Sequence, residues 1–435
     1  MQEVSSTRTA ITERLRTLRD AARTAPANGR MSVGPLRTGL NAREVVVRAA
    51  GLWLVTRVAL GLFTYFAVTY ANGHAHGPVS HDNPVVATSL SQYVVAWRQW
   101  DTYWYLTIVA KGYSQLPTAA FFPLYPTLVR ALSFVLGPQQ DALNAALVVS
   151  NVASLAAFIG LGLFATQEAG LDTATRSIRL LAAYPLAFFL ASGYSDGLFL
   201  ALAAFVLFFA RRGEWRWAVV CAFLAGLTRL TAVILILPLL WEYVRQHDLW
   251  TPPQWRAQLR NPGRLAELLA TLAAVPAGIG VFVIYLWHAF GDWKVTFHAE
   301  RLVWGHQMMM PGTSLWMALR NFFAATPGSV AQAHIAFDLG LVVMCGALTL
   351  LALRYLPVAF SLYMIGLLAL CMMSPIAIAQ DVYISAGRYL LAAAPLFLLL
   401  GQWSRRPWLD TLLVSAGFLV QGALAVQFLS GYWII

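Results

Sequence analysis

The sequence carries little charge for its length. Only 11% of its 435 residues are charged, 59% are hydrophobic, and the mean hydropathy is +0.63. Soluble domains carry roughly 25% charged residues. The scarcity of charge therefore excludes an ordinary soluble enzyme. Apolar runs of about 20 residues recur along the chain and predict an all-α polytopic membrane protein.

Cysteine is scarce as well. Cys221, Cys345 and Cys371 lie inside apolar runs without paired spacing, so we expect small buried hydrophobes and no disulfide or metal site. The chain has no phosphate-binding glycine loop, dinucleotide fingerprint or nucleophile elbow. A soluble nucleotide-sugar donor is therefore unsupported, and we assign no cofactor.

Acidic residues are outnumbered by basic ones, which gives a net charge of +11. Arginines crowd the first 48 residues and recur between apolar runs, most densely at Arg211–Arg216 and Arg245–Arg264. This is the pattern of cytoplasmic loops, and it does not indicate a nucleic-acid partner. Residues 1–45 lack the apolar core of a signal peptide and are expected to be a disordered cytoplasmic tail.

The basic loops set the direction of the spans. With the tail inside, a first span at Ala49–Tyr70 places residues 71–141 outside as a large loop. Trp217–Trp241 lies between two basic loops and is too short for two full spans. We expect a short hairpin there, whose tip at Thr228–Thr231 stops below the outer surface. Leu180–Leu190 and Leu198–Ala210 predict a similar pair with its tip at Gly193–Asp196.

The first external loop holds one acid among many rings. Asp101 lies in the aromatic segment Arg98–Tyr113. Aromatic rings this dense favour the membrane–water interface, so the segment predicts a helix lying on the bilayer. A second juxtamembrane helix is expected at Phe121–Leu136, because parity allows one crossing here and Asn144–Thr166 is the better span.

The remaining apolar runs complete the predicted topology. Further spans are expected at Leu265–Ala289, His334–Leu353, Pro357–Met373, Tyr389–Trp403 and Leu409–Leu429, about eleven in all and seven before the second external loop. We expect three parts: the tail 1–45, a module 46–333 with external loops 71–141 and 290–333, and C-terminal transmembrane helices 334–435.

Ionisable residues gather on the predicted outer face, where each is a functional candidate. They include Asp82, Asp101, Lys111, Asp196, Arg229, Asp292, Lys294, Glu300, Arg301, Asp381 and Arg388. An acid facing cations suits a reaction in which a phosphate leaves and a hydroxyl attacks. The carboxylate can take the hydroxyl proton, and guanidinium groups can neutralise the phosphate.

Structural alternatives stand beside these roles. Four alternatives stay open. Asp101 pairs with Arg98 or Lys111, and Arg229 pairs with Asp196. Arg388 is an interfacial anchor, and Asp292 and Lys294 form a solvated turn. His74, His76 and His81 lie near Asp82 but lack a fourth ligand in fixed register, so we assign no metal.

Six motifs give the chain a resemblance to a known family. They are Trp100–Tyr105 with Lys111–Tyr113, Phe121–Pro126, Tyr194–Phe199, Leu227–Arg229, Gly291–Trp293 and Gly387–Tyr389. In this order, over roughly residues 50–400, they resemble the PIG-V family of integral-membrane mannosyltransferases related to GPI mannosyltransferase 2, in the GT-C class. The class shares a module of seven leading spans with two helices in the first external loop.

The resemblance implies an inverting transferase. It would move a mannosyl or similar hexosyl residue from a polyprenyl-phosphate donor to a hydroxyl of a lipid, glycan or protein on the non-cytoplasmic face. We expect the plasma membrane of a bacterium. A transporter or flippase of a polyprenyl-linked sugar, or a non-catalytic membrane partner subunit, remains the alternative.

The resemblance also implies roles for particular residues. Asp101 matches the presumed base, and we expect Arg229 and Arg388 to hold the donor phosphate. Expected substrate contacts are Trp100, Tyr103, Trp104, Lys111, Tyr125, Tyr194, Asp196 and Asp292. The family often has Glu where this chain has Asp196, and no second acid adjoins Asp101 to form a metal pair.

Overall fold

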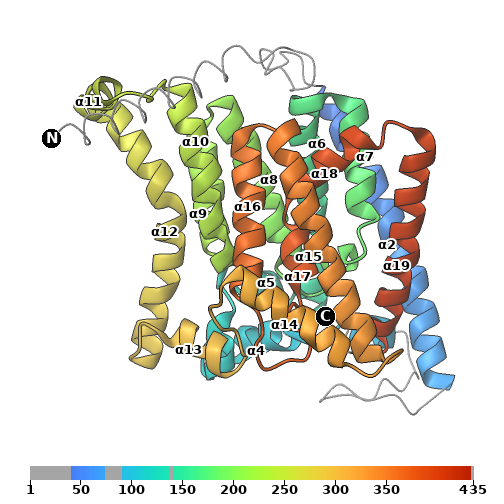
Figure 1. Ribbon diagram of the computed structural model, residues 1–435. Helices are drawn as coiled ribbons and strands as arrows, with labels where there is room; N and C mark the ends of the chain where they lie inside the picture. The colour runs from blue at the N-terminus through green and yellow to red at the C-terminus, as the bar shows by residue number, and fades with distance from the viewer. Residues whose placement is uncertain (1–40, 74–90, 138–141, 433–435) are drawn as a thin grey trace.

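The computed structural model describes residues 41–73, 91–137 and 142–432. Within these ranges the chain is helical, apart from one isolated β-bridge between His306 and Ile376. The all-α prediction is therefore confirmed. Long helices run side by side between two ends of a bundle (Figure 1). We call these the α4 end and the α11 end, after α4 (Asp101–Lys111) and α11 (Pro252–Arg260).

Among the described residues, five helices are long and apolar enough to cross a bilayer. They are α2 (Ala42–Gly73), α6 (Ala142–Ala169), α12 (Pro262–Phe290), α15 (Val330–Tyr355) and α19 (Pro407–Leu429). The chain is thus an integral membrane protein. Shorter helices run beside them, namely α8 (Asp196–Arg212), α9 (Trp215–Gly226), α10 (Ile236–Gln246), α16 (Val358–Met373) and α18 (Ala394–Trp403). The number eleven stays a prediction.

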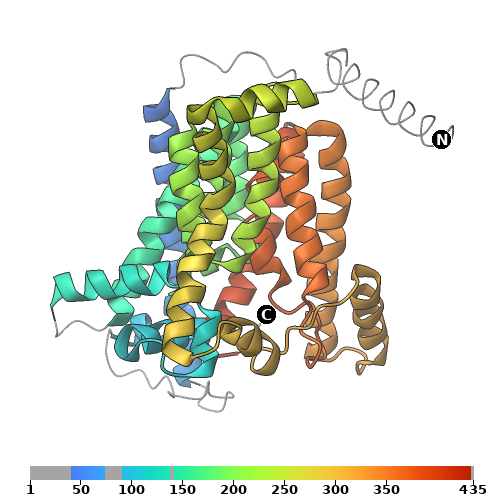
Figure 2. The same cartoon turned by 90° about the vertical axis from the view of Figure 1, so that its left-hand side faces the viewer.

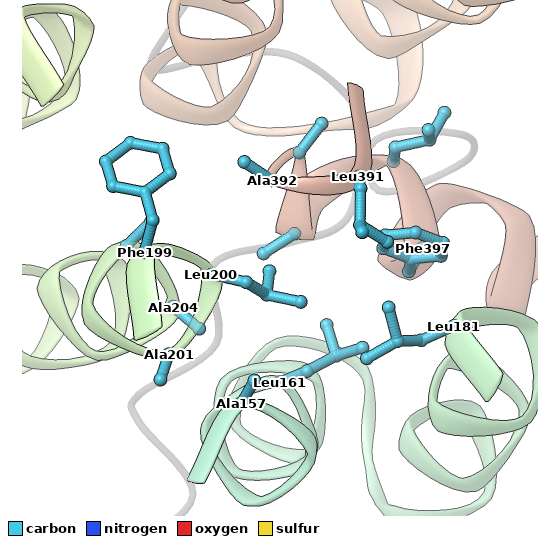
Figure 3. Close-up of a cluster of buried hydrophobic side chains, with 14 of the residues drawn as sticks. Ala157, Leu161, Leu181, Phe199, Leu200, Ala201, Ala204, Leu391, Ala392 and Phe397 are labelled. Carbon is cyan, nitrogen blue, oxygen red and sulfur yellow. The ribbon is translucent and has the colours of Figure 1, made fainter. Parts of the chain in front are cut away.

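The core joins α6 and α8 to the C-terminal helices. Figure 3 shows Ala157 and Leu161 of α6 facing Ala201 and Ala204 of α8. Small side chains let two helices approach closely. Helices inside a membrane associate through such close packing, because no hydrophobic effect drives them together there. Phe397 of α18 fills the space on the other side. This packing fixes α8, whose first residue carries one of the candidate charges.

Prolines interrupt two runs that were predicted to be continuous. Leu180–Leu190 is not one helix, because α7 (Leu171–Ala182) ends before Pro185 and a short 3₁₀ helix, η2 (Ala187–Leu190), follows. The predicted span Tyr389–Trp403 begins earlier, as α17 (Ala386–Leu391), and breaks before α18, which has Pro395 in its first turn. Proline lacks an N–H and clashes with the preceding turn, so a helix restarts at it more easily than it continues through it.

The predicted short hairpin is present. α9 ends at Gly226, and the chain returns through a 3₁₀ helix, η3 (Leu230–Leu235), into α10. The 12 residues of α9 extend about 18 Å, so the helix stops well short of the α4-end terminus of α12 (Figure 1). Its tip, with Arg229, therefore lies inside the bundle.

Short helices cover the α4 end (Figure 2). They are α3 (Ser91–Val95), α4, the 3₁₀ helix η1 (Leu116–Ala120), α5 (Leu124–Leu136), α13 (Val295–Leu302) and α14 (Pro311–Ala324). Two juxtamembrane helices, α4 and α5, are present as predicted. The aromatic segment is not one helix, however, because α4 begins only at Asp101. Most of the predicted tail, residues 1–40, lies outside the described residues.

Candidate functional site

Four charged side chains meet near the α4 end. Asp101 begins α4, Asp196 begins α8, Arg229 follows α9, and Arg388 lies in α17. Nη2 of Arg388 donates to Oδ2 of Asp101 at 2.7 Å and to Oδ2 of Asp196 at 3.2 Å. Nη2 of Arg229 donates to the same Asp196 oxygen at 2.6 Å. We call these four residues the charge cluster.

A distorted turn places Asp101 at the cluster. Trp100 precedes α4 with φ +51°, a left-handed conformation that a bulky residue rarely adopts. The buried Tyr194 holds this turn from the side of α8, since its hydroxyl accepts from the Asp101 N–H and donates to the Gln99 carbonyl, both at 3.3 Å. Such strain, of order 1–3 kcal/mol, persists only where surrounding contacts impose it.

Two hydroxyl groups position Arg229. The hydroxyl of Tyr105 donates to Oγ of Ser195 at 2.8 Å, and Nε of Arg229 donates to the same oxygen at 3.0 Å. Ser195 directly precedes Asp196, so α8 contacts this guanidinium through two consecutive side chains. Neither Tyr105 nor Ser195 was among the predicted site residues. Both lie within quoted motifs, which is the one signal that pointed to them.

The two carboxylates differ in how exposed they are to solvent. The Asp196 side chain is 2% exposed and lies between two guanidinium groups, whereas Asp101 is 17% exposed. Arg388 lies over the rings of Phe189 and Tyr194, with Cζ 4.9 and 4.6 Å from the ring centroids. Cation–π contact and two carboxylates together offset the cost of burying this cation. Asp101 is therefore the carboxylate that remains in reach of a ligand.

The ion pairs decide between the alternatives for these charges. Arg229 does pair with Asp196. Asp101 pairs with neither Arg98 nor Lys111 among the described contacts, and its partner is Arg388. Arg388 is thus buried in an ion-pair network and is not an interfacial anchor. With two aspartates and two arginines, the cluster has no surplus charge when all four are ionised.

The aromatic candidates lie at different depths. Trp100 is half-buried beside Asp101, and Tyr103 is exposed. Trp104 packs edge-on against Trp304, with centroids 6.0 Å apart. Tyr125 is fully buried, and its hydroxyl donates to the Ala146 carbonyl at 2.9 Å. The position of Tyr125 suits packing of α5 against α6 better than contact with a substrate.

The remaining two candidates lie apart from the cluster. Lys111 is the exposed last residue of α4. Asp292 lies before α13, where its carboxylate accepts from the Lys294 N–H at 2.9 Å and pairs with His298 at 2.8 Å. The alternative of a solvated turn at Asp292 and Lys294 agrees with this geometry.

Glu300 of α13 was among the outer-face candidates, but no role in the site was predicted for it. Its Oε2 lies 3.7 Å from Nε2 of His306, whose Nδ1 is 2.8 Å from the Ser374 carbonyl. Because a carbonyl oxygen only accepts, Nδ1 carries hydrogen and Nε2 of the neutral ring faces Glu300. Burial raises the pKa of Glu300 to about 7, and the negative charge of Asp101 contributes. No spacing pattern marks this residue.

No described group of three or more His, Cys, Asp or Glu side chains is placed to hold a metal ion. His74, His76, His81 and Asp82 lie outside the described residues. The described cysteines are free, and each lies in an apolar environment.

Comparisons with known proteins find a family match in the N-terminal part of the chain. Residues 46–239 match the model of the mannosyltransferase (PIG-V) family. The crystal structure of the Archaeoglobus fulgidus oligosaccharyltransferase complex with Zn and sulfate is similar over 87% of this chain, at 14% identity and a TM-score of 0.38. The chain covers 53% of that structure, about half its length. No curated protein matches the sequence.

The family match includes most of the charge cluster. Asp101, Asp196 and Arg229 fall within it, and Arg388 and Glu300 lie beyond it. The resemblance drawn from the motifs is therefore confirmed. Over residues 46–239, a little under half of its length, this chain is similar to the mannosyltransferase (PIG-V) family.

Proposed function

We propose that the protein is an inverting glycosyltransferase that moves a mannosyl or similar hexosyl residue from a polyprenyl-phosphate donor to an acceptor hydroxyl. The observation that carries this proposal is the charge cluster. A membrane bundle of a mannosyltransferase family brings an accessible carboxylate, Asp101, together with two arginines. The acceptor would be a lipid, a glycan or a protein.

The distribution of basic loops supports a reaction on the non-cytoplasmic side of the membrane. Arg211–Arg216 and Arg245–Arg264 lie at the α11 end, where α8 and α10 finish and α11 lies. Basic loops favour the cytoplasm, so the α11 end faces inward in this proposal. The charge cluster then faces the non-cytoplasmic side, in the plasma membrane, with the N-terminus inside.

The proposed step is a displacement at the anomeric carbon of the sugar. The acceptor oxygen attacks the anomeric carbon and forms the new C–O bond, while the bond from that carbon to the phosphate oxygen breaks. Its electron pair leaves with the polyprenyl phosphate. The hydroxyl proton passes to the Asp101 carboxylate, which later releases it to water. Arg388 fixes the direction of that carboxylate through its 2.7 Å contact.

The arginines retain donors for the leaving phosphate. Arg388 reaches both aspartates through Nη2, and Arg229 uses Nε and Nη2 within the protein. A guanidinium has five N–H groups, so each can also donate to a phosphate oxygen. Such donors act where negative charge develops as the sugar departs. Trp100, Tyr103 and Trp104 would line the path of the sugar or of the prenyl chain.

A vesicle assay tests this function against transport. The purified protein is inserted into vesicles with a polyprenyl-phosphate-mannose donor and a panel of lipid, glycan and peptide hydroxyl acceptors. We expect a mannosylated product with inverted anomeric configuration, identified by mass spectrometry and NMR. Movement of the intact donor between leaflets, with no glycosidic product from any acceptor, would instead support a flippase.

A further inference from the structure

Two buried aspartates face each other outside the charge cluster. Asp338 comes about 12 Å along α15 from its first residue and is 1% exposed. Asp381 lies in the segment between α16 and α17 and is 9% exposed. Their side-chain carboxyl groups are hydrogen-bonded to each other, and we call them the carboxyl pair. A carboxyl group inside a helix that is able to cross a bilayer is a candidate for function.

The contact within the carboxyl pair requires a proton. An ionised carboxylate only accepts hydrogen bonds, so one of the two groups has to carry hydrogen. Oδ1 of Asp338 and Oδ2 of Asp381 are both buried, and neither finds an N–H or O–H donor among the described residues. Where two carboxyl groups share a buried site, the pKa of one is strongly raised. The pair therefore carries a single negative charge, and the shared proton supplies the missing donor.

The groups around the pair leave this proton in place. His334 lies one turn before Asp338 on α15, and its charge, when present, favours the ionised form of Asp381. Burial opposes this effect and raises the pKa of Asp381 above its usual range. α18 has no ionisable side chain, and Arg320 of α14 is exposed. The other elements bring Tyr184 beside η2, Cys371 of α16, and Arg388 of α17, which is bound within the charge cluster.

The carboxyl pair fastens the segment that leads into α17. Residues 374–385, which we call the connector, join α16 to α17. The N–H of Ala377 donates to the Gly305 carbonyl at 3.1 Å, and Nδ2 of Asn321 donates to the Gln380 carbonyl at 2.8 Å. These contacts tie the connector to the segment after α13 and to α14. Through Asp381 the connector is also attached to α15, which packs beside α14 and α17 (Figure 1).

The end of the connector sets the position of Arg388. Asp381 precedes Arg388 by seven residues, and Ser385 between them has φ +71°. A residue with a side chain rarely adopts this left-handed conformation, which persists where surrounding contacts impose it. Inside α17, the Gly387 carbonyl accepts from the buried Tyr184 hydroxyl at 2.9 Å. The start of α17 is thus held by Tyr184 and by the connector together.

We propose that Asp338 and Asp381 are positioning residues, whose shared proton holds the connector against α15 so that α17 presents Arg388 to Asp101. When rising pH passes this proton to water, two buried carboxylates face each other and the connector leaves α15. With the proton present, the 2.7 Å contact between Arg388 and Asp101 is kept. The importance of that contact for transfer rests on the proposed function, whereas the proton-dependent attachment does not.

Hydrogen exchange of the full-length protein in nanodiscs tests the attachment. Exchange in peptides from the connector and α17 is measured by mass spectrometry from about pH 5 to about pH 9, because buried carboxyl groups titrate up to about pH 8–9. The rates are corrected for the intrinsic effect of pH on exchange. We expect wild-type protection in these peptides to fall about ten-fold or more as the pH rises.

Asparagine variants separate the shared proton from mere packing. Asp338→Asn and Asp381→Asn each place an amide donor in the contact that needs no titrating proton. We expect protection in both variants to remain at the low-pH level over the whole range. The two variants test the same contact from opposite sides, so the result does not depend on either one alone being well folded.

Glu300→Gln is the matched control. Glu300 lies against His306, whose Nδ1 contacts the Ser374 carbonyl of the connector at 2.8 Å, so its titration is the other route by which pH could act here. We expect this variant to keep the wild-type response of the connector to pH.

Three results would overturn the inference. They are wild-type protection that does not change with pH, a response to pH that persists in either asparagine variant, and a response that disappears in Glu300→Gln. Because no sugar is transferred in this measurement, the attachment can be confirmed even if the transferase proposal fails. Equally, transfer can be observed while the attachment proves independent of pH.

Discussion

Arg388 joins Asp101 to Asp196 through a single nitrogen atom, although 287 residues separate it from Asp101. The contact links α4 to the C-terminal helices. It also makes the direction of the Asp101 carboxylate depend on α17.

Replacing Arg388 tests that dependence. Arg388→Gln leaves two carboxylates with one arginine, so we expect a loss of about 3–5 kcal/mol in unfolding free energy together with loss of transfer. Arg388→Lys retains the charge but not the planar donors, and we expect it to recover stability more than activity. Thermal unfolding and transfer rates are measured together. Full activity in Arg388→Gln would show that this arginine does not orient the acid.

Tyr194 supports the strained turn before Asp101. Tyr194→Phe removes the hydroxyl that contacts Gln99 and Asp101, at a cost of about 1–3 kcal/mol, while keeping the buried ring. We expect kcat to fall and KM for the donor to change little, because the misplaced group is the acid. A rise in KM with unchanged kcat would indicate that Tyr194 acts on donor binding instead.

Glu300 predicts a pH response near neutrality. Its pKa of about 7 means that the carboxyl is neutral below this pH and negative above it, beside Asp101. The added negative charge opposes an anionic donor, so we expect transfer to fall as the pH rises through 7. In Glu300→Gln this step should disappear, since glutamine stays neutral. A step of the same size in the variant would assign the titration to another group.

Folding stability should also depend on pH through the Glu300 carboxyl. A pKa raised in the folded state favours the protonated form, so its contribution is present below the ordinary pKa of about 4.3 and is lost as the pH rises through about 7. We expect the melting temperature of the wild type to decline over this window relative to Glu300→Gln. One third of the side chain remains exposed, and hydration will limit the size of this difference.

Apolar periodicity was enough to locate the long helices. α6, α12 and α19 lie within a few residues of their predicted limits, because an uninterrupted apolar run has few alternatives to a helix in lipid. The breaks at Pro185 and Pro395 were missed. Apolar residues continue through both, and hydropathy alone does not distinguish a helix that stops from one that crosses.

The members of the charge cluster were predictable one by one. Asp101, Asp196, Arg229 and Arg388 each stand out as ionisable groups in apolar surroundings. The Arg388 partner of Asp101 was not predictable, because a contact over 287 residues leaves no trace in local spacing. The raised pKa of Glu300 was hidden for the same reason, since it arises from burial and from Asp101.

The central claim is that Asp101 accepts the proton of the attacking hydroxyl. The most direct measurement is the transfer rate of Asp101→Asn at saturating donor, with Asp172→Asn of α7 as a control at the α11 end. We predict a fall of about 10²–10⁴-fold for Asp101→Asn and wild-type rates for the control. A wild-type rate in Asp101→Asn, with the fold intact, would contradict the claim.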